Sequence, residues 1–125
     1  MKKPFAKRLK QEQKNLFFNI IFVVLAITIV ILFHENIPLT FALELILGII
    51  GLLKWKSKRT LAIFIFAGLF GPTAEAIVIY KSQAWAYAFP TFVKLIPEWL
   101  FLVWANAGAF IYEMSKEIHK LGVNK

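Results

Sequence analysis

The feature that most limits how this chain can fold is an uncharged apolar run from Leu16 to Phe33. Its 18 residues include only two polar members, Asn19 and Thr28. As a helix, the run would be about 27 Å long, which matches the hydrocarbon core of a bilayer. A cleaved signal peptide has a shorter apolar core and a small-residue cleavage site, which this run lacks. The run therefore predicts a retained membrane helix.

Three further apolar runs follow, and the four together predict an all-α, four-helix transmembrane bundle. The predicted spans are about 16–34, 38–54, 60–80 and 96–113. Of the 125 residues, 59% are hydrophobic and 18% are charged, and the mean hydropathy is +0.67. A soluble domain this small cannot bury so much apolar surface. We therefore expect one integral membrane domain over 1–125.

Lysine and arginine gather on one side of this predicted bundle. Six lie in the N-terminal tail 1–15, four in the turn 54–59 and three in the C-terminal tail 114–125. The opposite side carries only Lys81 and Lys94. Because cytoplasmic loops of membrane proteins are enriched in these residues, we expect a multi-pass protein of the cell membrane with both termini in the cytoplasm.

The net charge of +8 indicates a membrane surface as the partner, because the basic residues flank apolar runs. We expect contact with membrane lipid and no binding of nucleic acid. The chain has no cysteine, which excludes disulfides and thiol chemistry. No phosphate-binding glycine loop or zinc-protease motif is present. The sequence thus predicts no metal and no cofactor.

Two glutamates, Glu44 and Glu75, lie well inside predicted spans and away from the span ends, where an ionisable group is costly and often functional. Each is about five residues from the outer end of its helix, so neighbouring antiparallel helices would place both at a similar depth. Glu44 shares a helix face with Gly48, and Glu75 shares one with Gly71. Small residues mark helix contacts in membranes, so we expect both carboxyl groups to face protein. The alternative is that each glutamate only ties helices together.

Other polar and aromatic side chains cluster near the same outer end, including the segment 81–95, which is either a loop or an interfacial helix. The pattern predicts an outward-side acidic and aromatic pocket for a lipophilic, isoprenoid-like ligand. The candidate catalytic residues are Glu75 and Glu98, since a glutamate in such a pocket can donate a proton. The candidate ligand-binding residues are Glu44, Lys81, Trp85, Tyr87, Trp99 and Asn106.

The segment 75–102 resembles the lycopene cyclase domain family, small membrane subunits that cyclise the ends of carotenoids. The matching features are an acid at Glu75, a W-x-Y motif at Trp85 to Tyr87, and a proline–glutamate pair at Pro97 and Glu98 followed by Leu-Phe. The resemblance implies a bundle in which Glu75 or Glu98 protonates a polyene double bond and aromatic rings stabilise the resulting cation. The family usually has an aspartate at the first position and paired acids after the proline.

Three other functions are compatible with the same residues. The chain could be a carotenoid cyclase-type enzyme, or a proton- or cation-coupled small transporter that uses Glu44 and Glu75. It could also be an accessory subunit of a membrane complex, in which the glutamates tie helices together. A second copy of the chain or a different membrane subunit would then be its partner.

Overall fold

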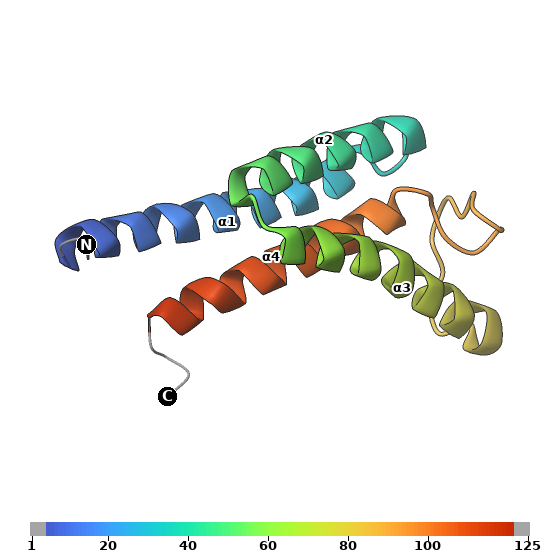
Figure 1. Ribbon diagram of the computed structural model, residues 1–125. Coiled ribbons are helices and arrows are strands. Elements are labelled where there is room, and N and C mark those ends of the chain that lie inside the picture. The colour runs from blue at the N-terminus through green and yellow to red at the C-terminus, as the bar shows by residue number, and fades with distance from the viewer. Residues whose placement is uncertain (1–4, 122–125) are drawn as a thin grey trace.

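The computed structural model describes residues 5–121, and this part of the chain forms four α-helices and no strand. The helices are α1 (Phe5–Phe33), α2 (Ile37–Trp55), α3 (Lys58–Ser82) and α4 (Leu100–Lys120), shown in Figure 1. The predicted all-α fold is confirmed. Three helices, α1, α2 and α3, are long and apolar enough to cross a membrane. The predicted fourth span overlaps α4, which is not among these three.

Short turns with defined caps separate the first three helices. The side chain of Asn36 accepts the backbone N–H of Leu39 at the start of α2, and Ser57 accepts that of Thr60 at the start of α3. Lys56 adopts a left-handed conformation with φ of 52° and ends α2. These turns are too short for a crossover, so α1 and α2, and α2 and α3, run antiparallel.

Both predicted tails are helical over almost all of their described residues, and only Leu121 lies outside a helix. Helix α1 reaches back to Phe5, so most of 1–15 continues the first helix, and α4 continues to Lys120, into the predicted tail 114–125. Residues 1–4 and 122–125 lie outside the described part. Lysine, arginine, glutamine and glutamate are good helix formers, which explains why each helix continues beyond its apolar run.

The last helix begins at Leu100, four residues later than the predicted start of the span 96–113. Ile96 is instead held in an antiparallel bridge, in which the N–H of Phe92 donates to its carbonyl at 2.7 Å. Pro97 follows and has no N–H to give to a helix. The segment 83–99 is therefore a loop with a tight turn at Val93 and Lys94, which both have positive φ. Of the two predictions for 81–95, a loop or an interfacial helix, the structure thus shows the loop, with residues 81 and 82 still in α3.

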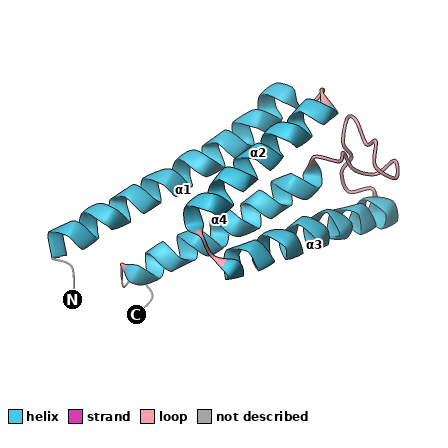
Figure 2. Ribbon diagram, turned by 45° about the horizontal axis from the view of Figure 1, so that its top comes forward, coloured by secondary structure: helices cyan, strands magenta, loops and turns pink. Residues whose placement is uncertain are grey.

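Helix α4 is the centre of the bundle, because it contacts each of the other three helices. Figure 2 shows α4 between α3 and the α1–α2 pair. Close packing depends on small residues: a Cβ at Gly68 would lie 3.0 Å from the carbonyl oxygen of Phe101, and one at Gly108 would lie 2.5 Å from the Cβ of Ala67.

The ends of the bundle differ in chemistry. One end is called here the basic end (Figure 2). It holds the N-termini of α1 and α3 and the C-termini of α2 and α4. The opposite end, called the loop end, carries the turn 34–36 and the loop 83–99. Between them the outer surface is apolar, with Leu32, Phe66 and Leu69 each more than 60% exposed. An apolar surface of this extent suits contact with lipid.

Candidate functional site

The carboxylate of Glu75 joins three parts of the chain at the loop end. Glu75 extends from α3, and its Oε1 accepts hydrogen bonds from the Tyr87 hydroxyl and, at 3.3 Å, from the Trp85 indole N–H. Its Oε2 accepts the indole N–H of Trp104, from α4. Two of these donors belong to the loop 83–99. Glu75 therefore ties this loop and α4 to α3.

The loop is also held by its own aromatic and polar contacts. The ring of Tyr87 meets that of Trp99 edge to face, with centroids 6.2 Å apart. Trp99 is buried and packs against Ile79. Burial, together with the hydrogen bond to Glu75 and the charge of Glu75, raises the pKa of Tyr87 above its ordinary value. Its hydroxyl thus stays protonated and remains a donor at neutral pH.

The other candidate catalytic acid, Glu98, lies apart from this cluster. Both of its carboxylate oxygens accept the hydroxyl of Thr91, at 2.7 and 2.9 Å, so it fastens the turn of the loop. It does not share a partner with Glu75 in any of the hydrogen bonds of the described residues. The structure therefore does not bring the two candidate catalytic acids together.

Two mainly apolar hollows adjoin the loop. The larger has a volume of about 320 Å³ and lies between α3, the loop and α4; its lining residues are Thr73, Ala76, Ile77, Tyr80, Lys81, Phe92, Leu95, Ile96 and Phe101. The smaller, of about 180 Å³, is lined by Val30, His34, Tyr87, Ala88, Phe89, Pro97 and Trp99. Neither Glu75 nor Glu98 lines either hollow, whereas Lys81 and Tyr87 each line one.

Glu44 and Asn106 form a second, fully buried polar contact. The Asn106 amide N–H₂ group donates to Glu44 Oε1 at 2.9 Å and to the backbone carbonyl of Glu44 at 3.0 Å. Glu44 Oε2 and Asn106 Oδ1 have no hydrogen-bond partner. A Cβ at Gly48 would lie 2.7 Å from Asn106 Oδ1, so the glycine makes room for the amide. This contact ties α2 to α4.

The structure does not place Glu44 and Glu75 in one pocket. Their partners on α4, Asn106 and Trp104, are two residues apart, which is about 3 Å along a helix but about 200° around it. The expected similarity in depth therefore agrees with the structure, whereas a shared cavity does not. The reason is that α4 contacts both α2 and α3 and presents a different flank to each of them.

A polar cluster at the basic end was not predicted from the sequence, which indicated only a tail there. Glu113 and Glu117, each 3% exposed, lie on the inner face of α4. Glu113 accepts the hydroxyl of Thr60, and Glu117 accepts the amide N–H of Asn15 at 3.2 Å. The signal that could have found them is their spacing of four residues, which puts both carboxylates on one face of a continuing helix.

Comparisons with models of known protein families, with curated proteins and with solved structures gave no significant match to the chain. The fold, with three candidate spans around a more polar central helix, is compatible with the class of small α-helical membrane proteins. Within the described residues, no group of three or more His, Asp or Glu side chains is arranged to hold a metal ion.

Proposed function

We propose that this protein is a small multi-pass protein of the cell membrane that binds a lipophilic, isoprenoid-like molecule at its loop end, with both termini in the cytoplasm. The observation that carries the proposal is the apolar hollow of about 320 Å³ between α3, the loop 83–99 and α4. Its volume falls in the range of known small-molecule sites, which are mostly apolar with a few placed polar groups.

The lining of this hollow favours a hydrocarbon ligand with one polar end. Phe92, from the loop, and Phe101, from α4, meet edge to face with centroids 5.1 Å apart and form an aromatic wall. Lys81, at the end of α3, supplies a cation on the lining. Both the aromatic wall and the cation would be satisfied by a ligand with an apolar body and a polar or anionic end. The body would lie against the phenylalanine rings, and the end would reach Lys81.

In this proposal Glu75 is a positioning residue, because it holds the loop that forms one wall of the hollow. Its two loop donors, Trp85 and Tyr87, are also residues that carry the resemblance to the lycopene cyclase domain family. This arrangement supports an isoprenoid-like ligand. It favours binding over cyclisation, since Glu75 and Glu98 are engaged by donors within the protein and line neither hollow.

The proposal is tested by filling the hollow with a larger side chain and measuring which lipid the purified protein carries. Ala76, which lines the hollow, is changed to phenylalanine, and the matched control changes Ala62, an exposed alanine of the same helix, to phenylalanine. Each protein is purified in mild detergent, extracted with organic solvent and analysed by mass spectrometry. We expect an isoprenoid-like lipid with the native protein and with Ala62→Phe, and its loss with Ala76→Phe.

Two results would overturn the proposal: the native protein carries no such lipid, or Ala76→Phe, still folded by thermal unfolding, carries as much as the control. Formation of a cyclised product from a linear polyene by the native protein, abolished in Glu75→Gln, would establish the enzymatic alternative instead.

A further inference from the structure

The contact between Glu44 and Asn106 leaves one oxygen of each residue without a donor. The Asn106 N–H₂ group donates to Glu44 Oε1 at 2.9 Å and to the Glu44 backbone carbonyl at 3.0 Å. Glu44 Oε2 and Asn106 Oδ1 have no hydrogen-bond partner and are sealed from solvent. Glu44 is 0% exposed and Asn106 is 1% exposed. Buried polar atoms in native proteins are nearly always satisfied, so this pair requires one more donor.

The amide of Asn106 cannot supply that donor by turning round. Its N–H₂ group already serves two acceptors, and a reversed amide would direct Oδ1 at the same two oxygens. The surroundings of Oδ1 are apolar. A Cβ at Gly48 would lie 2.7 Å from Oδ1 and 2.9 Å from Cε2 of Phe64, so the oxygen and the phenyl ring meet at the glycine. Neither Gly48 nor Phe64 has a side-chain donor for the amide oxygen.

The middle of the bundle also offers Glu44 no cation. Apart from Glu44, no acidic or basic side chain occurs in the four apolar stretches of the bundle, which are 16–33, 36–53, 60–74 and 99–111. Glu44 takes part in no ion pair within the part of the chain that the structure describes. The like charge of Glu75 is held on the opposite flank of α4. An isolated buried carboxylate is so costly that such a group becomes neutral instead.

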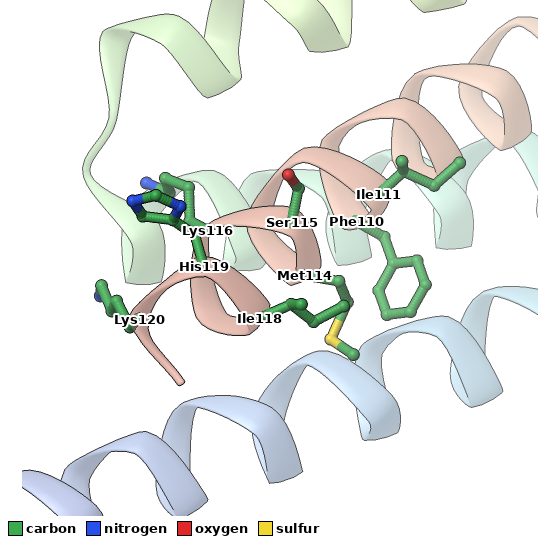
Figure 3. A pocket seen from close by; sticks show the side chains of 8 residues that line it. All are labelled: Phe110, Ile111, Met114, Ser115, Lys116, Ile118, His119 and Lys120. Carbon is green, nitrogen blue, oxygen red and sulfur yellow. The ribbon is translucent and has the colours of Figure 1, made fainter. Parts of the chain in front are cut away.

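The hollows of the structure do not reach this contact. A groove of about 730 Å³ follows the C-terminal half of α4, and its lining residues, shown in Figure 3, all lie between Phe110 and Lys120. Glu44 and Asn106 line neither this groove, nor a polar hollow of about 250 Å³ at the basic end, nor the two hollows at the loop end. None of these four hollows gives a molecule access to the contact, whereas a proton needs no cavity.

We propose that Glu44 and Asn106 form a proton-binding site, in which a proton on Glu44 Oε2 is donated to Asn106 Oδ1. A carboxylic acid and an amide that share one N–H···O=C bond are complementary in their remaining atoms, because the acid O–H donates and the amide carbonyl accepts. The proton satisfies both unpaired oxygens and removes the buried charge. Glu44 is thus a neutral acid at neutral pH, and reciprocal hydrogen bonds fasten α2 to α4. The site does not involve the loop-end hollow and does not depend on the proposed function.

The other occupant that two oxygens could take is a metal cation. Hard cations bind six or more oxygen ligands and require the carboxylate to be ionised. The contact offers Glu44 Oε2 and Asn106 Oδ1 as its unpaired oxygens, and the phenyl ring of Phe64 adjoins the amide oxygen. The coordination is therefore too small for a cation and sufficient for a proton.

The experiment records the infrared spectrum of the purified protein in detergent at neutral pH, where the C=O stretch of a carboxylic acid is separate from the bands of carboxylates and the backbone. We expect an acid band in the native protein and its loss in Glu44→Gln, whose amide N–H₂ group can still donate to Asn106 Oδ1. In Asn106→Leu the band should move to a higher wavenumber, because the acid C=O loses its donor. The control is Glu35→Gln, which changes an exposed glutamate and should leave the band unchanged.

A native spectrum without an acid band would overturn the proposal, and so would a band that survives in Glu44→Gln or keeps its position in Asn106→Leu. A band that appears only after sodium and potassium are replaced by a large organic cation marks a cation site and also overturns it. Should Glu44→Gln fail to fold, the band is assigned by exclusion. Glu12 and Glu117 are the other glutamates of the described residues with an unpaired buried oxygen. Glu12→Gln with Glu117→Gln should therefore leave the Glu44 band in place, and the absence of any acid band in that variant would overturn the proposal.

Discussion

Glu44 and Glu75 are hydrogen-bonded to opposite flanks of the same helix, at nearly the same depth. Glu44 binds Asn106 and Glu75 binds Trp104, and both partners belong to α4. The central helix thus collects the polar contacts of its neighbours, which explains why its own sequence is more polar than that of α1, α2 or α3. A helix shielded by three apolar helices can carry buried amides and carboxylates, provided that each finds a partner.

The contacts of Glu75 give the first prediction. Glu75→Gln keeps one acceptor oxygen but turns an amide N–H₂ group toward indole and phenol donors, so at least one donor loses its partner. We expect a loss of about 1–3 kcal/mol in the free energy of unfolding. The measurement is thermal or denaturant unfolding in a fixed detergent. Glu98→Gln is the control, and we expect a change below about 0.5 kcal/mol, because Thr91 still finds a carbonyl oxygen. Equal losses would contradict the prediction.

A second prediction concerns the contact of Gly71 with Trp104. A Cβ at Gly71 would lie 2.1–2.5 Å from atoms of the Trp104 indole, whose N–H is held by Glu75. Gly71→Ala must displace this ring, and we expect it to cost about 1–3 kcal/mol of stability. Trp104→Leu removes the ring. Gly71→Ala should therefore cost much less stability in the Trp104→Leu background. A double-mutant cycle by denaturant unfolding measures this coupling, and additive effects would show that the indole is not the obstacle.

The sequence was sufficient to predict four helices and the ends of α2 and α3 to within two residues, because each apolar run and each short turn has a local cause. It did not predict where α1 and α4 begin or how far α4 continues. Asn36, Ser57 and Lys56 mark helix ends through contacts within a few residues. The pairing of side chains across helices has no such local cause. Whether Glu44 meets Glu75 or Asn106 depends on which helix packs between the others, and Trp104 was not distinguishable from a residue that faces lipid.

The Glu44–Asn106 contact gives a third prediction. Asn106→Leu removes both hydrogen bonds to Glu44 and leaves its carboxyl group buried without a donor. We expect the free energy of unfolding to fall by about 1–3 kcal/mol. Glu44→Gln keeps a carbonyl oxygen for Asn106 and should cost clearly less. Combining Asn106→Leu with Glu44→Leu removes the unsatisfied group and should recover part of the stability. Unfolding in detergent measures all three, and a double variant that is less stable than Asn106→Leu alone would contradict this account.

The raised pKa of Tyr87 predicts how the loop end responds to alkali. Burial is the first cause, followed by the hydrogen bond to Glu75 and the charge of Glu75. An unfolded tyrosine ionises near pH 10. Because the pKa of the folded state is higher, the contribution of the neutral phenol to stability is complete below about pH 10. It is lost as the pH rises above this value toward the pKa of the folded state.

Ultraviolet absorbance during a pH titration reports the ionisation of Tyr87 directly, since ionised tyrosine absorbs at longer wavelength. In the native protein we expect one tyrosine to ionise late, and Tyr87→Phe should remove that late phase. Tyr80→Phe is the matched control, because Tyr80 is 70% exposed, and this change should leave the late phase in place. If Tyr87→Phe instead removed an ordinary phase, the hydroxyl would not be held by Glu75 in a buried contact, and the loop would not be fastened in the way described.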